Sequence, residues 1–259
     1  DGKLAGALSY QIQRFETVRH AGFTPAADLA EVRDRSKLQS NALVSTEPRA
    51  QGDSPFHSLQ PVFTLGGLSP AVADLFAPRF AALGLSATAL GGSTQTAATL
   101  NPPNGSVKPS TLRPGGAVAV ALATGDITLA GTGTVSRVDG QQVTAFGHPM
   151  LSLGEVALPM CAAEVITILP SQMQSVKIAN TGAIIGTITQ DRLSAVSGTL
   201  GAGPEMTNVE VTVNPTRGAP RTLKFSVARQ QQLMPVIVAA GVSQAILGSN
   251  DGGLANGFR

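Results

Sequence analysis

His148 is the residue in this chain best suited to chemistry, because an imidazole can take up and release a proton near neutral pH. It stands between Gly147 and Pro149. Glycine permits an unusual backbone conformation, and proline prevents a strand from pairing further. The sequence therefore predicts a general base at the end of a strand. The alternative is a structural histidine that caps the strand end, since one histidine alone makes no active site.

Partners for His148 would come from serine and aspartate side chains. No serine stands in a nucleophile motif such as Gly-x-Ser-x-Gly. The candidates are Ser136, Ser152, Ser171, Ser175, Asp126, Asp139 and Asp191. Asp139 is also explained as a turn residue, and Asp191 as part of a turn at 190–192 with an ion pair to Arg192. The other histidines, His20 and His57, have polar neighbours and are expected at the surface.

A β-hairpin is predicted to carry His148. Its first strand, 127–138, contains many β-branched residues, and Asp139-Gly140 is a strong two-residue turn signal. The return strand, 142–146, leads directly to Gly147 and His148. The hairpin would place the imidazole at the mouth of a barrel.

The elements around this hairpin are mostly short strands, which favours a mainly β fold with a few helices. Further strands are expected at 3–13, 117–123, 165–169, 175–179, 183–189, 193–200, 209–213 and 222–228. Helices are expected after Thr24-Pro25, with Thr24 as the N-cap and Pro25 as the first helical residue, after Ser69-Pro70 and over 233–247. Residues 34–59 have the composition of an exposed loop. A passage rich in Gly, Ser, Thr and Pro at 91–114 predicts two domains, 1–105 and 106–259.

Composition excludes several classes of function. The 259 residues are 42% hydrophobic and 13% charged, with a net charge of +2, which predicts a well-buried core and not a disordered chain. Basic residues are scattered and Trp is absent, which argues against nucleic-acid binding. The single Cys161 excludes an internal disulfide and cysteine zinc sites, and the three histidines lack metal-ligand spacing. No cofactor is indicated, the apolar run 233–247 is too short to span a membrane, and the oligomeric state is left open.

Several motifs together resemble the SpoIVB-type serine endopeptidases, a family related to chymotrypsin. The resemblance covers about 112–213 and is closer to the large bacterial proteins that carry this domain than to the short sporulation protease. It rests on the segments 112–120, 125–135, 146–149, 158–160, 177–180, 185–192 and 198–201. It implies a chymotrypsin-like double barrel, whose His-bearing half is 106–259. It also implies a polypeptide substrate, a secreted, periplasmic or cell-envelope location, and His148 as the general base of a Ser–His–Asp triad.

The start of the chain extends the resemblance. Asp1-Gly2-Lys3 and the strand after it are similar to the turn and strand that follow the nucleophile segment of the family, Gly-Met-Ser-Gly-Ser-Pro. The serine and the acidic residue would then lie upstream of Asp1, and 1–105 would hold the rest of the serine-bearing half. This implies a permuted fold, incomplete at its N-terminus, and a chain that is inactive by itself and partnered by the upstream segment. The alternative function is a non-catalytic secreted or envelope module for binding or structure.

Overall fold

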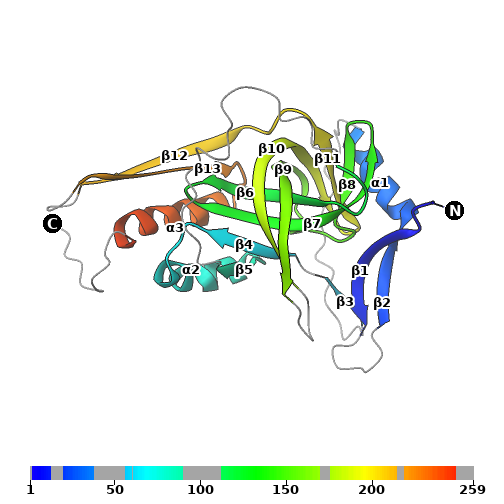
Figure 1. Ribbon diagram of the computed structural model, residues 1–259, viewed down its shortest axis with the longest axis horizontal. Coiled ribbons are helices and arrows are strands. Elements are labelled where there is room, and N and C mark those ends of the chain that lie inside the picture. Colours follow the sequence, from blue (N-terminus) through cyan, green and yellow to red (C-terminus); the bar gives the residue numbers. More distant parts are fainter. Residues whose placement is uncertain are drawn as a thin grey trace. The chain divides into compact units, whose positions relative to one another are not determined.

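The computed structural model describes residues 2–12, 20–37, 56–59, 61–89, 112–169, 176–214 and 219–248. The described residues are mainly β with three helices, which confirms the predicted class (Figure 1). Ser171 and Ser175 lie outside the described residues, as do most of the predicted loop at 34–59 and of the predicted boundary at 91–114.

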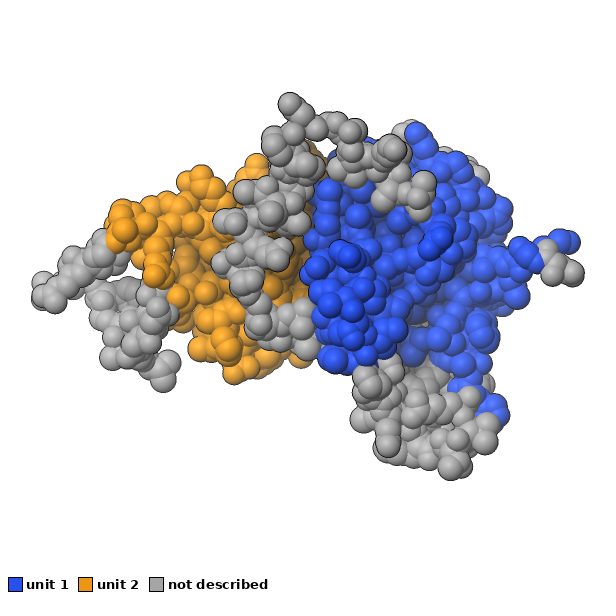
Figure 2. Space-filling model, viewed as in Figure 1, with its two compact units in different colours: residues 1–61, 106–120, 132–203 blue, residues 62–105, 121–131, 204–259 orange. Residues whose placement is uncertain are grey.

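The chain forms two compact units (Figure 2). Unit 1 comprises Asp1–Pro61, Ser106–Val120 and Thr132–Gly203, and unit 2 comprises Val62–Gly105, Ala121–Gly131 and Pro204–Arg259. Each unit takes residues from both sides of position 105, so these units differ from the two segments expected from the sequence. The physical reason is that Gly- and Pro-rich composition marks where a linker runs, whereas packing decides which segments fold together.

Six strands contribute to a closed ring. They are β6 (Ala117–Gly125), β7 (Thr128–Asp139), β8 (Gln142–Ala145), β9 (Gly154–Leu169), β10 (Val176–Arg192) and β11 (Ala195–Leu200). They pair in the order β6-β9-β10-β11-β8-β7, and a further pairing of β6 with β7 closes the ring. At the closure, the amide of Gly115 donates to Val135 and the amide of Val135 donates to Gly116, each at 2.8 Å.

The N-terminal part of unit 1 packs against this ring. Strands β1 (Gly6–Ile12), β2 (His20–Pro25) and β3 (Phe56–Ser58) form a small sheet in the order β2-β1-β3, and helix α1 (Ala26–Lys37) follows β2. The helix contacts β8, β10 and β11. Its apolar side is the reason, because Leu29 and Val32 form a buried cluster with Ala195 of β11 and with Ala7 of β1.

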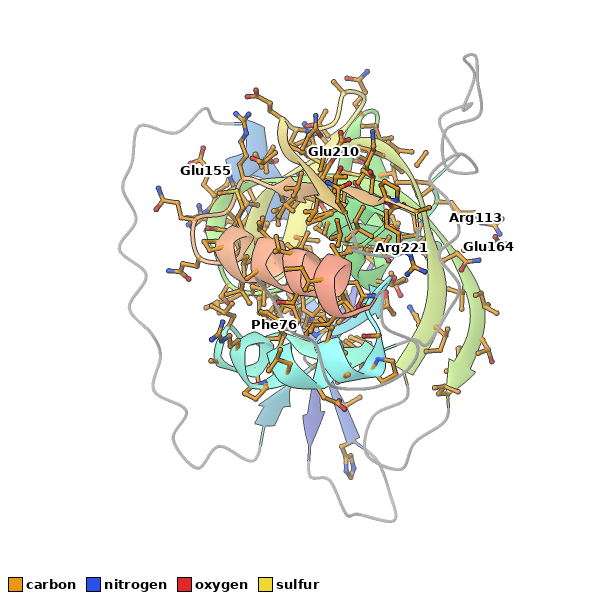
Figure 3. The ribbon with its side chains drawn as sticks, turned by 90° about the vertical axis from the view of Figure 1, so that its left-hand side faces the viewer. Phe76, Arg113, Glu155, Glu164, Glu210 and Arg221 are labelled. Atoms are coloured by element: carbon orange, nitrogen blue, oxygen red, sulfur yellow. The ribbon has the colours of Figure 1, made fainter. Side chains whose placement is uncertain are left out.

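Unit 2 combines strands with two packed helices. Its complete elements are β4 (Val62–Gly66), α2 (Pro70–Ala82), β5 (Ser86–Ala89), β12 (Met206–Val213), β13 (Arg221–Ala228) and α3 (Met234–Leu247). Helix α2 contacts α3. Phe76 lies on α2 (Figure 3). Its ring centroid is 6.3 Å from that of Phe80 on the same helix. No helix in the described part of the chain combines the length and the apolar character needed to cross a membrane.

The strands β9 and β10 are longer than the sequence predicts. The expected strand 165–169 is only the end of β9, and the expected strands 175–179 and 183–189 are both parts of β10, with residue 175 itself outside the described residues. The turn predicted at 190–192 is wrong, because β10 continues to Arg192 and the turn lies at 193–194. The register between β9 and β10 is irregular, which allows β10 to continue through Thr181 and Gly182, where the sequence predicts a gap between two strands.

Candidate functional site

The predicted hairpin is present in the structure and leads to His148. Strands β7 and β8 pair up to Asp139 and Gln142, so the two turn residues are Gly140 and Gln141, one position later than predicted. Gly140 has a φ of 59°, and a positive φ at the first turn position is the conformation that glycine favours in hairpins. Strand β8 ends at Ala145, and His148 follows in the irregular segment 146–153.

The residue before His148 is held by two buried hydroxyl groups. Thr24 Oγ1 donates to the carbonyl oxygen of Gly147 at 2.7 Å, and Ser9 Oγ donates to the same oxygen. The backbone N–H of Thr24 donates in turn to Ser9 Oγ at 3.0 Å. The sequence predicts Thr24 as the N-cap of helix α1, but its hydroxyl instead donates to the Gly147 carbonyl. Ser9 and Thr24 are 1% and 3% exposed, so these bonds fix Gly147 away from water.

The His148 ring has a defined tautomer in its neutral form. Its Nδ1 lies 2.9 Å from the carbonyl oxygen of Pro149. A carbonyl oxygen only accepts hydrogen bonds, so Nδ1 carries the proton and Nε2 is the basic nitrogen. The ring also meets Phe146 edge to face, with centroids 5.7 Å apart. This is the tautomer that a histidine base needs when it takes a proton through Nε2.

Burial lowers the pKa of His148 below its ordinary value of 6.5. The hydrogen bond to Pro149 and the negative charge of Asp191 raise this pKa, and the positive charge of Lys177 lowers it, but burial is the largest effect. The neutral imidazole is therefore favoured at pH 7, and it is the form that can accept a proton.

Asp191 is the described candidate partner whose charge acts on His148. Its side chain is completely buried, and its carboxylate accepts hydrogen bonds from the backbone N–H groups of Met150, Leu151 and Leu153 at 2.7, 2.8 and 3.1 Å. The predicted pairing with Arg192 is wrong, because Arg192 Nε donates to Gln190 Oε1. Burial raises the pKa of Asp191, while the three N–H donors and His148 oppose that rise.

The sequence did not single out the pair formed by Lys177 and Thr134. Lys177 of β10 donates from Nζ to Thr134 Oγ1 of β7. Burial lowers the pKa of this half-buried ammonium group, whose charge also acts on His148. Lys177 does lie within one of the segments that carry the family resemblance, but nothing local distinguishes it from a surface lysine.

The other candidates lie in different settings. Asp139 forms ion pairs of 2.7 Å with both Arg33 and Arg137, and these two arginines lower its pKa. Asp126 accepts a hydrogen bond from the Lys224 amide at 2.7 Å in unit 2. Both aspartates therefore have structural partners, and no contact in the described residues connects either of them to His148.

Two candidate serines and two further histidines also lie in the described part of the chain. Ser136 is on β7, and Ser152 has a φ of 58° in the segment after His148. His20 begins β2 and is exposed, as predicted, while His57 lies within β3. Among the described residues, no group of three His, Cys, Asp or Glu side chains is arranged to hold a metal ion.

Comparison of the chain with protein-family models, curated proteins and solved structures found no match. The chemistry of the site consequently rests on its own geometry. A neutral imidazole with Nε2 as its basic nitrogen can act as a proton acceptor, and buried hydrogen bonds to the Gly147 carbonyl and from the Met150 amide hold the backbone on both sides of it.

Proposed function

We propose that this chain is the His-bearing portion of a SpoIVB-type serine endopeptidase. His148 Nε2 takes the proton of a serine hydroxyl as that serine attacks the carbonyl carbon of a peptide bond, and His148 then protonates the leaving amine. The resemblance places the serine and the acidic residue of the triad upstream of Asp1, and within this chain the acceptor of His148 Nδ1–H is the Pro149 carbonyl. The isolated chain has no hydrolytic activity under this proposal, and the complete protein acts outside the cytoplasm.

The observation that carries the proposal is the hydrogen bond from His148 Nδ1 to the Pro149 carbonyl. It assigns the proton of the neutral ring to Nδ1 and leaves Nε2 as the basic nitrogen, which is the division of roles in a serine hydrolase. Burial supports the same role, because it keeps the imidazole unprotonated at neutral pH.

Two features of the fold support the proposal. The closed ring of six strands has the form expected for one barrel of a chymotrypsin-like pair, and His148 follows its strand β8. Strand β1 belongs to the segment that the resemblance places just after the nucleophile, and its Ser9 bonds to the residue before His148. A serine segment joined to β1 would therefore belong to the same unit as the imidazole.

A fluorophosphonate probe tests the proposal in the full-length protein with the residues that precede Asp1. Such probes label a serine only when a base activates it. We expect labelling of one upstream serine, loss of labelling in His148→Ala, and unchanged labelling in the matched control His20→Ala. Labelling that persists in His148→Ala would remove His148 from the mechanism. Labelling of Thr134 in the chain that begins at Asp1 would assign the nucleophile to this chain instead.

A binding module is the second candidate function, and exposed apolar side chains favour it. In the hairpin formed by β9 and β10, Ile166 and Ile168 are 60% and 56% exposed, and Leu169 is 49% exposed. A two-stranded ribbon with exposed apolar residues can contact a partner without catalysis. A full-length protein that fluorophosphonate does not label, and whose function is lost on Ile166→Ser and Ile168→Ser but not on His148→Ala, would establish this alternative.

A further inference from the structure

One peptide group joins His148 to a buried carboxylate. The carbonyl oxygen of Pro149 accepts a hydrogen bond from His148 Nδ1 at 2.9 Å. The N–H of Met150, on the other side of the same peptide bond, donates to Asp191 Oδ1 at 2.7 Å. The two hydrogen bonds and the peptide group between them form a continuous connection, which we name the peptide relay.

We propose that Asp191 is a positioning residue for His148 and acts on it through the peptide relay. Hydrogen bonds in a chain polarise one another, so a carboxylate that accepts from the Met150 N–H makes the Pro149 carbonyl a stronger acceptor for Nδ1–H. Asp191 thereby keeps the proton on Nδ1 and leaves Nε2 free to accept one. The catalytic consequence rests on the proposed function, whereas the tautomer of His148 does not.

The surroundings of Asp191 are suited to this role. The carboxylate is completely buried and also accepts the N–H groups of Leu151 and Leu153, so it fixes the whole segment that follows Pro149. That segment does not hold its shape by local preference, because Ser152 has a φ of 58° in the left-handed region that L-residues disfavour. Three hydrogen bonds to a charged acceptor supply the stabilisation that the backbone itself lacks.

The peptide relay performs within this chain the task that an aspartate performs in a Ser–His–Asp triad. In such a triad the carboxylate bonds directly to Nδ1–H, orients the ring and stabilises the imidazolium. Here the Pro149 carbonyl occupies that position, and the negative charge of Asp191 still favours the protonated ring. Among the described residues, the charged side chains that act on His148 are Asp191 and Lys177, both on β10, and of these two Asp191 favours the imidazolium.

Nitrogen-15 NMR of the histidine side chains tests the peptide relay in the chain from Asp1 to Arg259. At a pH where His148 is neutral, we expect a single tautomer with the proton on Nδ1. Asp191→Asn should give a mixture of the two tautomers, whereas Arg192→Gln, which removes a charge from the neighbouring position, should not. A His148 spectrum unchanged by Asp191→Asn, or a wild-type ring protonated on Nε2, would overturn the proposal.

A second measurement covers the case in which Asp191→Asn does not fold. In the wild-type chain, protonation of His148 should shift the Met150 amide resonance with the same midpoint as the ring, because the relay connects them. The amide of Leu153, which bonds to Asp191 outside the relay, should shift less. A Met150 amide that does not respond to the titration of His148 would contradict the relay without any variant.

The catalytic consequence is measured in the full-length protein. Asp191→Asn should lower kcat by about 100-fold or more, since correct general-base catalysis contributes about 10²–10⁴-fold. It should also displace the acid limb of the pH profile to lower pH, because the charge of Asp191 raises the pKa of His148. Full activity of this variant with an unchanged pH profile would reject the role of Asp191. A wild-type protein without hydrolase activity would reject the proposed function, while the NMR result would stand.

Discussion

At the scale of single residues, burial and two opposite charges set the protonation of His148. Burial has the largest effect and lowers its pKa, Asp191 raises it and Lys177 lowers it. The imidazole is therefore a weaker base than free histidine, but a larger fraction of it is unprotonated at pH 7. A general base is most effective when its pKa lies near the working pH. The charge of Lys177 lowers the pKa of His148, so Lys177 affects how strong a base this imidazole is.

Lys177→Gln should raise the pKa of His148 towards 6.5, because it removes a nearby positive charge. We expect the NMR titration midpoint of His148 to be below 6.5 in the wild-type chain and higher in the variant. Lys224→Gln is the control, since Lys224 pairs with Glu210 on exposed strands of unit 2. A midpoint that falls or does not move in Lys177→Gln would contradict the conclusion that the charge of Lys177 lowers the pKa of His148.

The lowered pKa of His148 also makes stability depend on pH. As pH falls through about 6.5, the unfolded chain binds a proton at this histidine before the folded chain does. The folded state therefore loses stability as pH falls from 6.5 to the lower pKa of the folded protein. In His148→Gln this loss disappears, so the free energy of unfolding of wild type minus variant should decrease between pH 7 and pH 5. A difference that stays constant over this range would contradict the lowered pKa.

At the scale of elements, strands β1 and β2 hold the segment that follows β8. Ser9 of β1 and Thr24 of β2 both bond to the Gly147 carbonyl. Gly147 has a φ of 77°, and a Cβ added there would lie 2.4 Å from Ala7 Cβ and 3.1 Å from the Leu8 carbonyl oxygen. The approach of β1 thus requires glycine immediately before the histidine.

Gly147→Ala should destabilise the chain by about 2–5 kcal/mol, because left-handed strain and overpacking add. Gly115→Ala is the matched control. Gly115 also has a positive φ, 85°, but a Cβ there meets no atom within 4 Å, so only the backbone strain of about 1–2 kcal/mol remains. Urea unfolding compares the two. Equal losses of stability would show that Ala7 of β1 leaves room for a methyl group at Gly147.

Local signals in the sequence predicted the elements better than they predicted the site. The turn signal at Asp139-Gly140 and the helix start near Thr24-Pro25 depend on neighbouring residues, and both elements are present, displaced by one position. The sequence predicts that the Thr24 hydroxyl caps helix α1, because local residues do not reveal the distant Gly147 carbonyl to which it donates.

Residues in the site that depend on distant partners were missed or misread. The polar residues at 190–192 predict a turn that contains Asp191, yet the partners of Asp191 are backbone groups about 40 positions earlier. Lys177 meets Thr134 only because β10 and β7 fold into one unit. The tautomer of His148 depends on the carbonyl of the next residue, and no pattern of residue types encodes that orientation.

At the scale of the whole molecule, the reactivity of Cys161 in unit 1 indicates whether the ring of strands around it is intact. Cys161 lies on β9, opposite Ala119 of β6 and Ile184 of β10. Its thiol is fully buried, and burial raises its pKa to about 12. Since the thiolate is the reactive form, Cys161 reacts with a disulfide reagent only when the ring opens.

Labelling of Cys161 by a disulfide reagent therefore measures the opening of unit 1. Leu29, which is 2% exposed, joins α1 to Ala195 of β11, so Leu29→Ala should destabilise the unit by about 2–4 kcal/mol. If α1 and the ring unfold together, labelling should become about 30- to 1,000-fold faster, because each 1.4 kcal/mol changes the open fraction tenfold. Leu193→Ala, at a position 63% exposed, should leave the rate unchanged. An equal rate in Leu29→Ala and wild type would mean that α1 separates from the ring without opening it, and fast labelling of the wild type would mean that the ring itself is open in the native state.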